Sequence, residues 1–85
     1  MKWKLKENIQ FEELEKYGYM SWEKEDAEVR YFKLIPMNRL LIEVHKSRVI
    51  DYQLPLFSIV KKEDIKIETF IQDLIKANLV EKVEG

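Results

Sequence analysis

The chain has 85 residues, a formal net charge of −1, no cysteine, one histidine and a single internal glycine, Gly18. This composition excludes a glycine-rich phosphate-binding loop, and His45 alone cannot supply the ligand set of a structural zinc site. We therefore expect no cofactor, no bound metal, no catalytic residue and no enzymatic activity.

No segment has the pattern of a secretory signal or of a membrane helix. The basic stretch 2–6 is not followed by the apolar run of a signal peptide. No apolar run approaches the ~18 residues that a membrane-spanning helix needs. We expect a cytoplasmic protein that does not bind membranes.

The first stretch of the chain, residues 2–6, alternates lysines with Trp3 and Leu5. This alternation is typical of an edge strand with its apolar side chains turned inward. Lysines interleaved with an aromatic ring are also found in proteins that bind single-stranded nucleic acid. We favour the edge strand, or an arm docked on the fold.

A short helix is predicted over residues 9–17. Asn8 can accept hydrogen bonds from the free backbone N–H groups at its start. Gly18 can adopt the left-handed conformation that ends a helix, with Tyr19 packed on Leu14 as the apolar pair of that ending. The polar segment 21–26 that follows is predicted to be a loop.

Three strands are predicted in the middle of the chain. Residues 28–35 carry apolar side chains on both faces, which is typical of a central strand. After a turn at 36–39, residues 40–44 place alternate apolar side chains on one face. The third strand has Ile50, Tyr52 and Leu54 on one face, and Pro55 ends it.

The hairpin between the second and third strands has a restricted register. Val44 and Ile50 should lie on the same face of the sheet, and directly paired residues share a face. The loop between paired residues must therefore be odd in length. Val44 pairs either with Arg48, across three residues, or with Ile50, across five residues.

The end of the chain predicts a longer helix, because apolar residues from Ile67 to Ile75 recur on one side of it. Asp64 is the expected N-cap, and Asn78 the expected left-handed ending. Residues 79–83 follow as a short strand. Segment 56–60 is an apolar connection that we expect beneath the core.

These elements predict an α+β fold in which residues 1–85 form a single domain. The expected architecture is a short N-terminal helix, a three-stranded antiparallel meander and a C-terminal helix packed on one face of the sheet.

Charge is unevenly distributed along the sequence. Residues 1–28 and 63–85 each carry a net charge of −3, and residues 29–62 carry +5. The basic segment 29–62 is either an anion-binding surface or the complement of the acidic ends within the fold, and we favour the complement. The candidate nucleic-acid or anion contacts are Arg30, Lys33, Arg39, Lys46 and Arg48.

His45 lies beside Lys46 in the predicted hairpin turn. A catalytic general base needs both an orienting partner and a nucleophile within hydrogen-bond reach. We interpret His45 as an exposed turn residue.

The stretches IQFEELEKYGY, residues 9–19, and DLIKANLVEKV, residues 73–83, contain the two predicted helix endings. Together they resemble the ends of small uncharacterised proteins from phages and prophages of Gram-positive bacteria. The resemblance implies an accessory protein of a mobile element and assigns no catalytic residue.

Our functional hypothesis is a small non-enzymatic accessory protein, encoded by a phage, that acts as a protein-interaction module. The chain has more large aromatic side chains than a small core needs, and such residues are enriched at protein interfaces. The expected partner is another protein or a second copy of the chain. The alternative is a nucleic-acid-binding protein that uses the basic segment 29–62.

Overall fold

The structure is a computed structural model that describes residues 2–24, 26–36, 39–55, 61 and 65–83. Its main element is a six-stranded antiparallel sheet with the strand order β2-β3-β4-β5-β1-β6. The strands are β1 (Lys2–Leu5), β2 (Met20–Ser21), β3 (Val29–Ile35), β4 (Leu40–His45), β5 (Val49–Gln53) and β6 (Val80–Val83). The helical elements of the described residues are a 3₁₀ helix η1 (Phe11–Tyr17), a 3₁₀ turn η3 (Ile67–Thr69) and a short α-helix α1 (Gln72–Lys76).

The predicted architecture of three strands and two helices is therefore wrong. The expected meander is present as β3, β4 and β5, but β2 extends it on one side and β1 and β6 extend it on the other. These added strands have two to four residues each. Segments 2–6 and 79–83 are predicted as strands from their own residues, but their places in the sheet depend on pairing with distant segments. Strand β2 has only two residues, too few for an alternation to be recognised.

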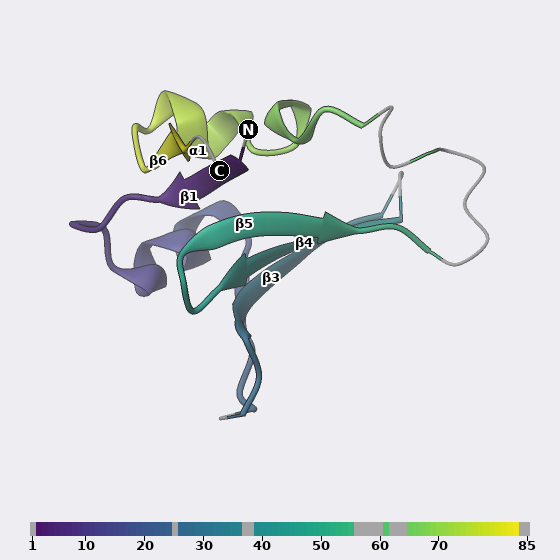
Figure 1. Cartoon of the computed structure of the whole chain (residues 1–85), viewed down its shortest axis with the longest axis horizontal. Coiled ribbons are helices and arrows are strands. Elements are labelled where there is room, and N and C mark those ends of the chain that lie inside the picture. The colour runs from purple at the N-terminus through teal and green to yellow at the C-terminus, as the bar shows by residue number, and fades with distance from the viewer. Residues whose placement is uncertain (1, 25, 37–38, 56–60, 62–64, 84–85) are drawn as a thin grey trace.

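Strand β1 lies inside the sheet, so its prediction as an edge strand is wrong. Trp3 is paired with Ile50 of β5 on one side and with Lys82 of β6 on the other. Leu5 is buried, as the alternation predicts. The strand thus joins both ends of the chain to the meander, and Figure 1 shows β1 and β6 side by side above β5.

The hairpin of β4 and β5 confirms one of the two predicted registers. Val44 is paired with Ile50, which is the alternative with five residues between the partners. Leu40, Ile42 and Val44 are fully buried on the inner face of the sheet. The same register places Tyr31 on this inner face, because Tyr31 is the partner of Val44 on β3.

The core is one cluster on the inner face of the sheet, to which the helical segments add residues. Leu14 of η1 and Leu74 of α1 are both fully buried in it. The buried members are Leu5, Leu14, Tyr19, Tyr31, Leu40, Ile42, Val44, Ile50, Ile71, Leu74, Leu79 and Val80.

The first helical segment is a 3₁₀ helix that begins at Phe11 rather than an α-helix that begins at residue 9, and Asn8 is not its cap. The carbonyl oxygen of Ile9, which would accept from Glu13 in an α-helix, accepts from Arg48 Nη1 over 2.7 Å. The N–H of Glu13 donates to Gln10 instead, which is the 3₁₀ pattern.

The ending of η1 is as predicted. Gly18 has a φ of +88°, and the N–H of Tyr19 donates to the carbonyl of Leu14. The predicted loop after it is partly wrong, because Ser21 belongs to β2 and pairs with Tyr31.

The predicted C-terminal helix is interrupted. Helical geometry is lost at Ile71, whose φ is −121°, between η3 and α1. Residues with branched side chains at Cβ, such as Ile67, Thr69 and Ile71, weaken a helix. The turn η3 is held instead by the Trp3 side chain, whose Nε1 donates to Glu68 over 3.0 Å.

The end of α1 has the predicted left-handed residue. Asn78 has a φ of +61°, and the N–H of Leu79 donates to the carbonyl of Leu74. Strand β6 follows, as expected. The predicted N-cap Asp64 and the segment 56–60 lie outside the described residues.

Candidate protein-interaction patch and adjoining pocket

The outer face of the sheet carries an apolar patch near its β2 edge. Directly paired residues share a face, so Met20 lies beside Phe32, and Leu34 lies beside Leu41. Met20, Trp22 and Leu34 are 62%, 40% and 58% exposed, the exposed large apolar residues of the described chain. We call Met20, Trp22, Phe32, Leu34 and Leu41 the outer patch.

Trp22 is fixed at the end of β2. Its backbone N–H donates to the carbonyl of Arg30 over 2.8 Å. Its indole packs edge-on against the Phe32 ring, with 5.4 Å between the centroids and an interplanar angle of 84°. The patch therefore has an ordered aromatic pair at one end, which reduces the entropy lost when a partner binds.

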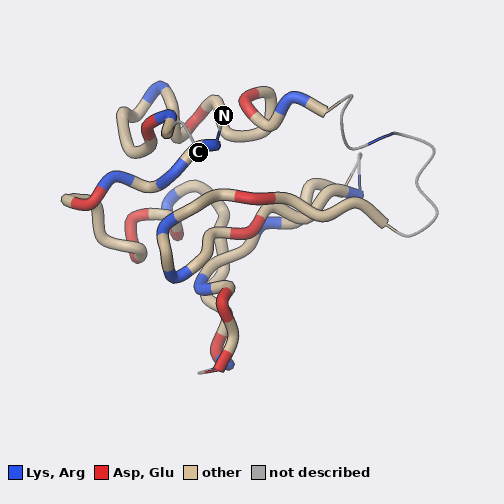
Figure 2. Tube along the Cα trace, in the orientation of Figure 1, with Lys and Arg blue, Asp and Glu red and all other residues tan. Residues whose placement is uncertain are grey.

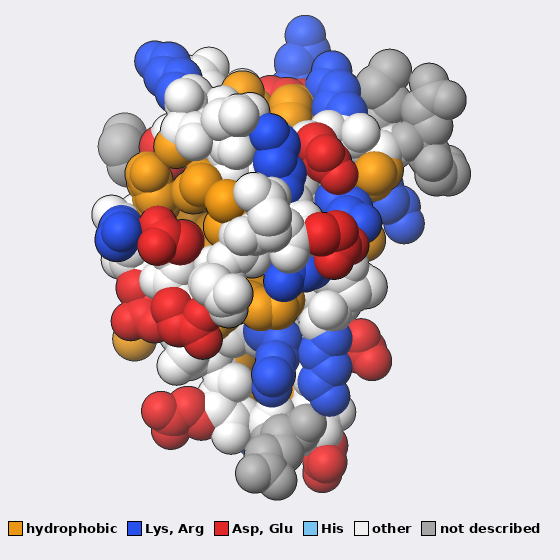
Figure 3. All heavy atoms as spheres, turned by 90° about the vertical axis from the view of Figure 1, so that its left-hand side faces the viewer, with side chains coloured by type: hydrophobic (Ala, Val, Ile, Leu, Met, Phe, Trp, Pro, Cys, Tyr) orange, Lys and Arg blue, Asp and Glu red, His pale blue; other side chains and the backbone are white. Residues whose placement is uncertain are grey.

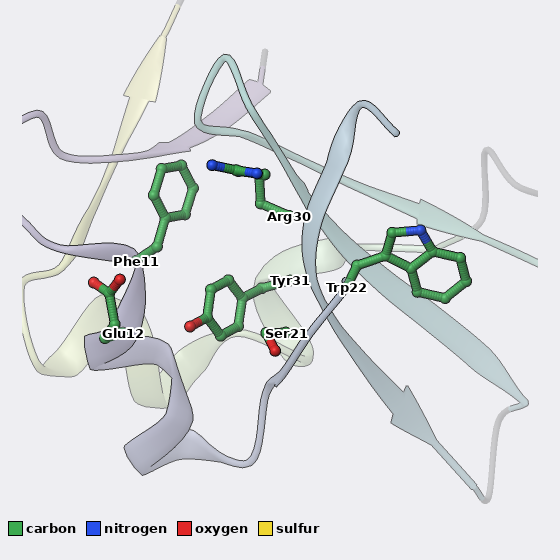
Figure 4. Close-up of a pocket in the computed structure, with 6 residues that line it drawn as sticks. All are labelled: Phe11, Glu12, Ser21, Trp22, Arg30 and Tyr31. Atoms are coloured by element: carbon green, nitrogen blue, oxygen red, sulfur yellow. The ribbon is translucent and has the colours of Figure 1, made fainter. Parts of the chain in front are cut away.

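A pocket of about 210 Å³ lies on the other side of β2. Figure 4 shows the rings of Phe11 and Tyr31 lining it, with Arg30 reaching toward Phe11 and the Trp22 ring turned away. The lining residues are Phe11, Glu12, Ser21, Trp22, Arg30 and Tyr31.

A β-bulge places Arg30 at this pocket. Val29 is paired with His45 and Tyr31 with Val44, so Arg30 is the extra residue of β3. In a regular strand Arg30 would point to the outer face, away from Tyr31. Bulges commonly redirect a side chain toward a functional site.

The aromatic wall of the pocket is held from behind. The Phe11 and Tyr31 rings are stacked, with 6.2 Å between the centroids and an interplanar angle of 4°. The Arg48 guanidinium lies 4.9 Å from the centre of the Phe11 ring and donates to the carbonyl oxygens of Lys6 and Ile9. The position of Phe11 is thus set before any ligand binds.

Carboxylates of η1 border the pocket on one side. The Tyr31 hydroxyl donates to Glu15 over 2.8 Å. Burial first, and this hydrogen bond second, raise the pKa of Tyr31 from its usual 10.0 to about 12. Figure 3 shows acidic side chains beside basic ones on this end of the molecule, with small apolar areas between them.

Two of the five predicted anion contacts are used inside the fold. The Lys33 Nζ donates to the carbonyl of Tyr17 over 2.8 Å and lies 3.7 Å from Asp73. Arg48 is bonded to backbone carbonyls and lies 3.4 Å from Glu7. Both contacts join the basic segment to the acidic ends of the chain.

The other three predicted contacts are exposed but do not form one surface. Arg30 and Lys46 lie at the same end of the sheet, since the N–H of Lys46 donates to the carbonyl of Glu28. Arg39 lies at the opposite end of β4. In Figure 2 the basic residues along β3 to β5 are separated by acidic ones.

His45 is the last residue of β4 and is partly buried, so its interpretation as an exposed turn residue is wrong. Its Nε2 lies 3.8 Å from a carboxylate oxygen of Glu43. That nitrogen is buried and has no hydrogen-bond partner within the described chain.

Metal-binding and membrane-spanning features were also sought. No cluster of three or more potential metal ligands occurs among residues whose positions the structure gives. No helix in those residues has the length and apolar character needed to cross a membrane.

Sequence reasoning did not find the outer patch or the pocket. Both depend on β2, whose Ser21 is predicted to belong to a polar loop, and on a bulge that no sequence motif predicts. The usable signal is the apolar side chains on both faces of β3, because Leu34 on one of those faces is 58% exposed.

Comparisons of the chain with protein-family models, with curated proteins and with solved structures find no match.

Proposed function

We propose that this protein is a non-enzymatic protein-interaction module that binds its partner through the outer patch. The proposal includes the accessory role in a phage or prophage and the cytoplasmic location that we expect from the sequence. A second copy of the chain is one possible partner.

The clustering of exposed apolar residues carries the proposal. Met20 and Leu34 lie on the neighbouring strands β2 and β3, and Trp22, which follows β2, packs against Phe32 on the same face. Single exposed apolar residues are ordinary, but a contiguous group of them with an aromatic member is characteristic of an interface.

Nucleic-acid binding has less support. Non-specific binding needs several cations aligned on one surface. Lys33 and Arg48 are engaged within the fold, and Arg39 is distant from Arg30 and Lys46.

The experiment compares Leu34→Ser and Met20→Ser with the control Lys76→Ser. Lys76 is exposed on α1, away from β2. Sedimentation measures self-association, and affinity capture from the native host measures stoichiometric partners. We expect the two patch variants to lose the partner or the dimer, and the control to keep it.

A partner that is retained equally by all three variants would contradict the proposal. Binding of a DNA or RNA oligonucleotide below ~1 μM, with the steep salt dependence of phosphate contacts, would support the nucleic-acid alternative instead.

A further inference from the structure

We propose that the pocket between η1 and β3 binds an aromatic side chain that has a carboxylate beside it in a partner protein. The inference rests on the proposed function, because it specifies the chemistry of the protein segment that the module binds. The bulge at Arg30 and the fixed ring of Phe11 carry it.

The size and walls of the pocket favour one aromatic ring. Its volume of about 210 Å³ is below the roughly 300–1,000 Å³ of pockets for drug-sized molecules. Phe11 and Tyr31 provide aromatic surfaces that prefer edge-to-face or offset contact with another ring. Since Arg48 and Tyr31 both contact the Phe11 ring, little order has to be created on binding.

The charged residues of the pocket favour a carboxylate and an N–H donor on the ligand. Among the described residues, no hydrogen bond or ion pair engages the Arg30 guanidinium or the Glu12 carboxylate. Arg30 can bind a carboxylate through two N–H groups, and Glu12 can accept from a peptide N–H. An aromatic residue followed by an acidic one offers both groups.

A nucleotide fits these surroundings less well than a peptide does. A base could stack on Phe11, and Arg30 could bind a phosphate. However, Glu12 lines the pocket and Glu15 lies at the Tyr31 hydroxyl, and their charge opposes a polyphosphate chain. A single carboxylate needs only the one cation that the bulge supplies.

The test is a titration of the labelled protein by NMR with N-acetyl-L-phenylalanine, which carries a ring, a carboxylate and an amide N–H. Its neutral analogue, N-acetyl-L-phenylalaninamide, and N-acetyl-L-leucine are the comparison probes. We expect saturable shifts at the backbone amides of Ser21, Trp22 and Tyr31. The neutral analogue should bind roughly two- to fivefold more weakly, as expected for an exposed ion pair.

Arg30→Gln should lower the affinity for N-acetyl-L-phenylalanine to that for its neutral amide analogue. The affinity for the neutral analogue itself should not change. The matched control is Arg39→Gln, an exposed arginine at the other end of β4, which should change neither affinity. Phe11→Leu should remove the preference for phenylalanine over leucine, and the spectrum of each variant shows whether it is folded.

Three results would overturn the inference. The wild type could bind the acid and its neutral amide equally well, could bind the leucine and phenylalanine probes equally well, or could bind a dinucleotide more tightly than these probes. The two proposals remain separable, because Leu34→Ser should retain probe binding. If the probes do not bind but the patch variants lose the partner, the pocket proposal alone is rejected. If the probes bind but the patch variants keep the partner, the outer-patch proposal alone is rejected.

Discussion

At the scale of single residues, Gly18 has a role that a side chain would disturb. Its φ of +88° lies in the left-handed region, which residues with a Cβ adopt at a cost. A Cβ would come no closer than 3.5 Å to the Lys33 side chain, an ordinary van der Waals contact, so the cost comes from the backbone. We predict that Gly18→Ala lowers the free energy of unfolding by about 1 kcal/mol or more, measured by chemical denaturation.

Asn78 provides the matched control, because it ends α1 with a φ of +61°. Asn78→Gly should leave stability unchanged or raise it slightly, since glycine accepts this conformation freely. Unchanged stability of Gly18→Ala would show that η1 does not depend on its left-handed ending.

Tyr31 should produce a pH-dependent contribution to stability. Because its pKa in the fold, about 12, exceeds the usual 10.0, the neutral phenol is favoured by folding. The contribution is complete below pH 10 and disappears as the pH rises toward 12. Tyr31→Phe should therefore be less stable than the wild type by about 1 kcal/mol at neutral pH, and this difference should shrink over that window.

Denaturation of both proteins across the pH range checks this prediction, since the other titrating groups are common to both. A difference that stays constant up to pH 12 would mean that burial and Glu15 do not raise the pKa of Tyr31 in the fold.

The sequence does not show where one side chain contacts a distant part of the backbone. Arg48 reads as a surface cation in a turn, but it is bonded to the carbonyls of Lys6 and Ile9. Arg30 is predicted as an anion contact, and its position at the pocket follows from a bulge. A pattern of residue types cannot show either effect, because both depend on which segments meet.

At the scale of elements, α1 is short, and most of its stability must come from packing. It has five residues, too few to form in isolation. Leu74 is fully buried in the core and its carbonyl accepts the hydrogen bond that ends the helix. We predict that Leu74→Ala costs about 2–5 kcal/mol of unfolding free energy, from lost burial and the resulting cavity.

The comparison variant is Lys76→Ala on the exposed side of the same helix, which should change stability by less than about 0.5 kcal/mol. A loss below about 1 kcal/mol for Leu74→Ala would show that the helix can leave the sheet at little cost.

The elements that were predicted correctly are those whose own sequence determines them. The strand 40–44 alternates cleanly, and the endings at Gly18 and Asn78 need a left-handed residue followed by an apolar one. The continuous helix over Ile67 to Ile75 failed because a helical spacing also suits a turn and a short helix that bury the same residues.

At the scale of the whole molecule, β1 holds the sheet together although it lies near the start of the described chain. It has β5 on one side and β6 on the other, and the N–H of Leu5 donates to the carbonyl of Arg48 over 2.8 Å. The edge strand β2 has two residues and one neighbour. An internal strand can open only when the sheet around it opens, whereas an edge strand opens locally.

Amide hydrogen exchange should reveal this difference. We predict that the Leu5 amide is among the slowest to exchange, with an opening free energy close to that of global unfolding, because its strand is covered on both sides. The Trp22 amide, which donates to Arg30 at the β2 edge over the same 2.8 Å, should exchange through local opening at a lower free energy. Since the two hydrogen bonds have equal lengths, we attribute a difference in opening free energy to their places in the sheet. Equal protection of Leu5 and Trp22 would mean that the sheet opens as one unit from edge to edge, and the outer patch at β2 would then be as rigid as the core.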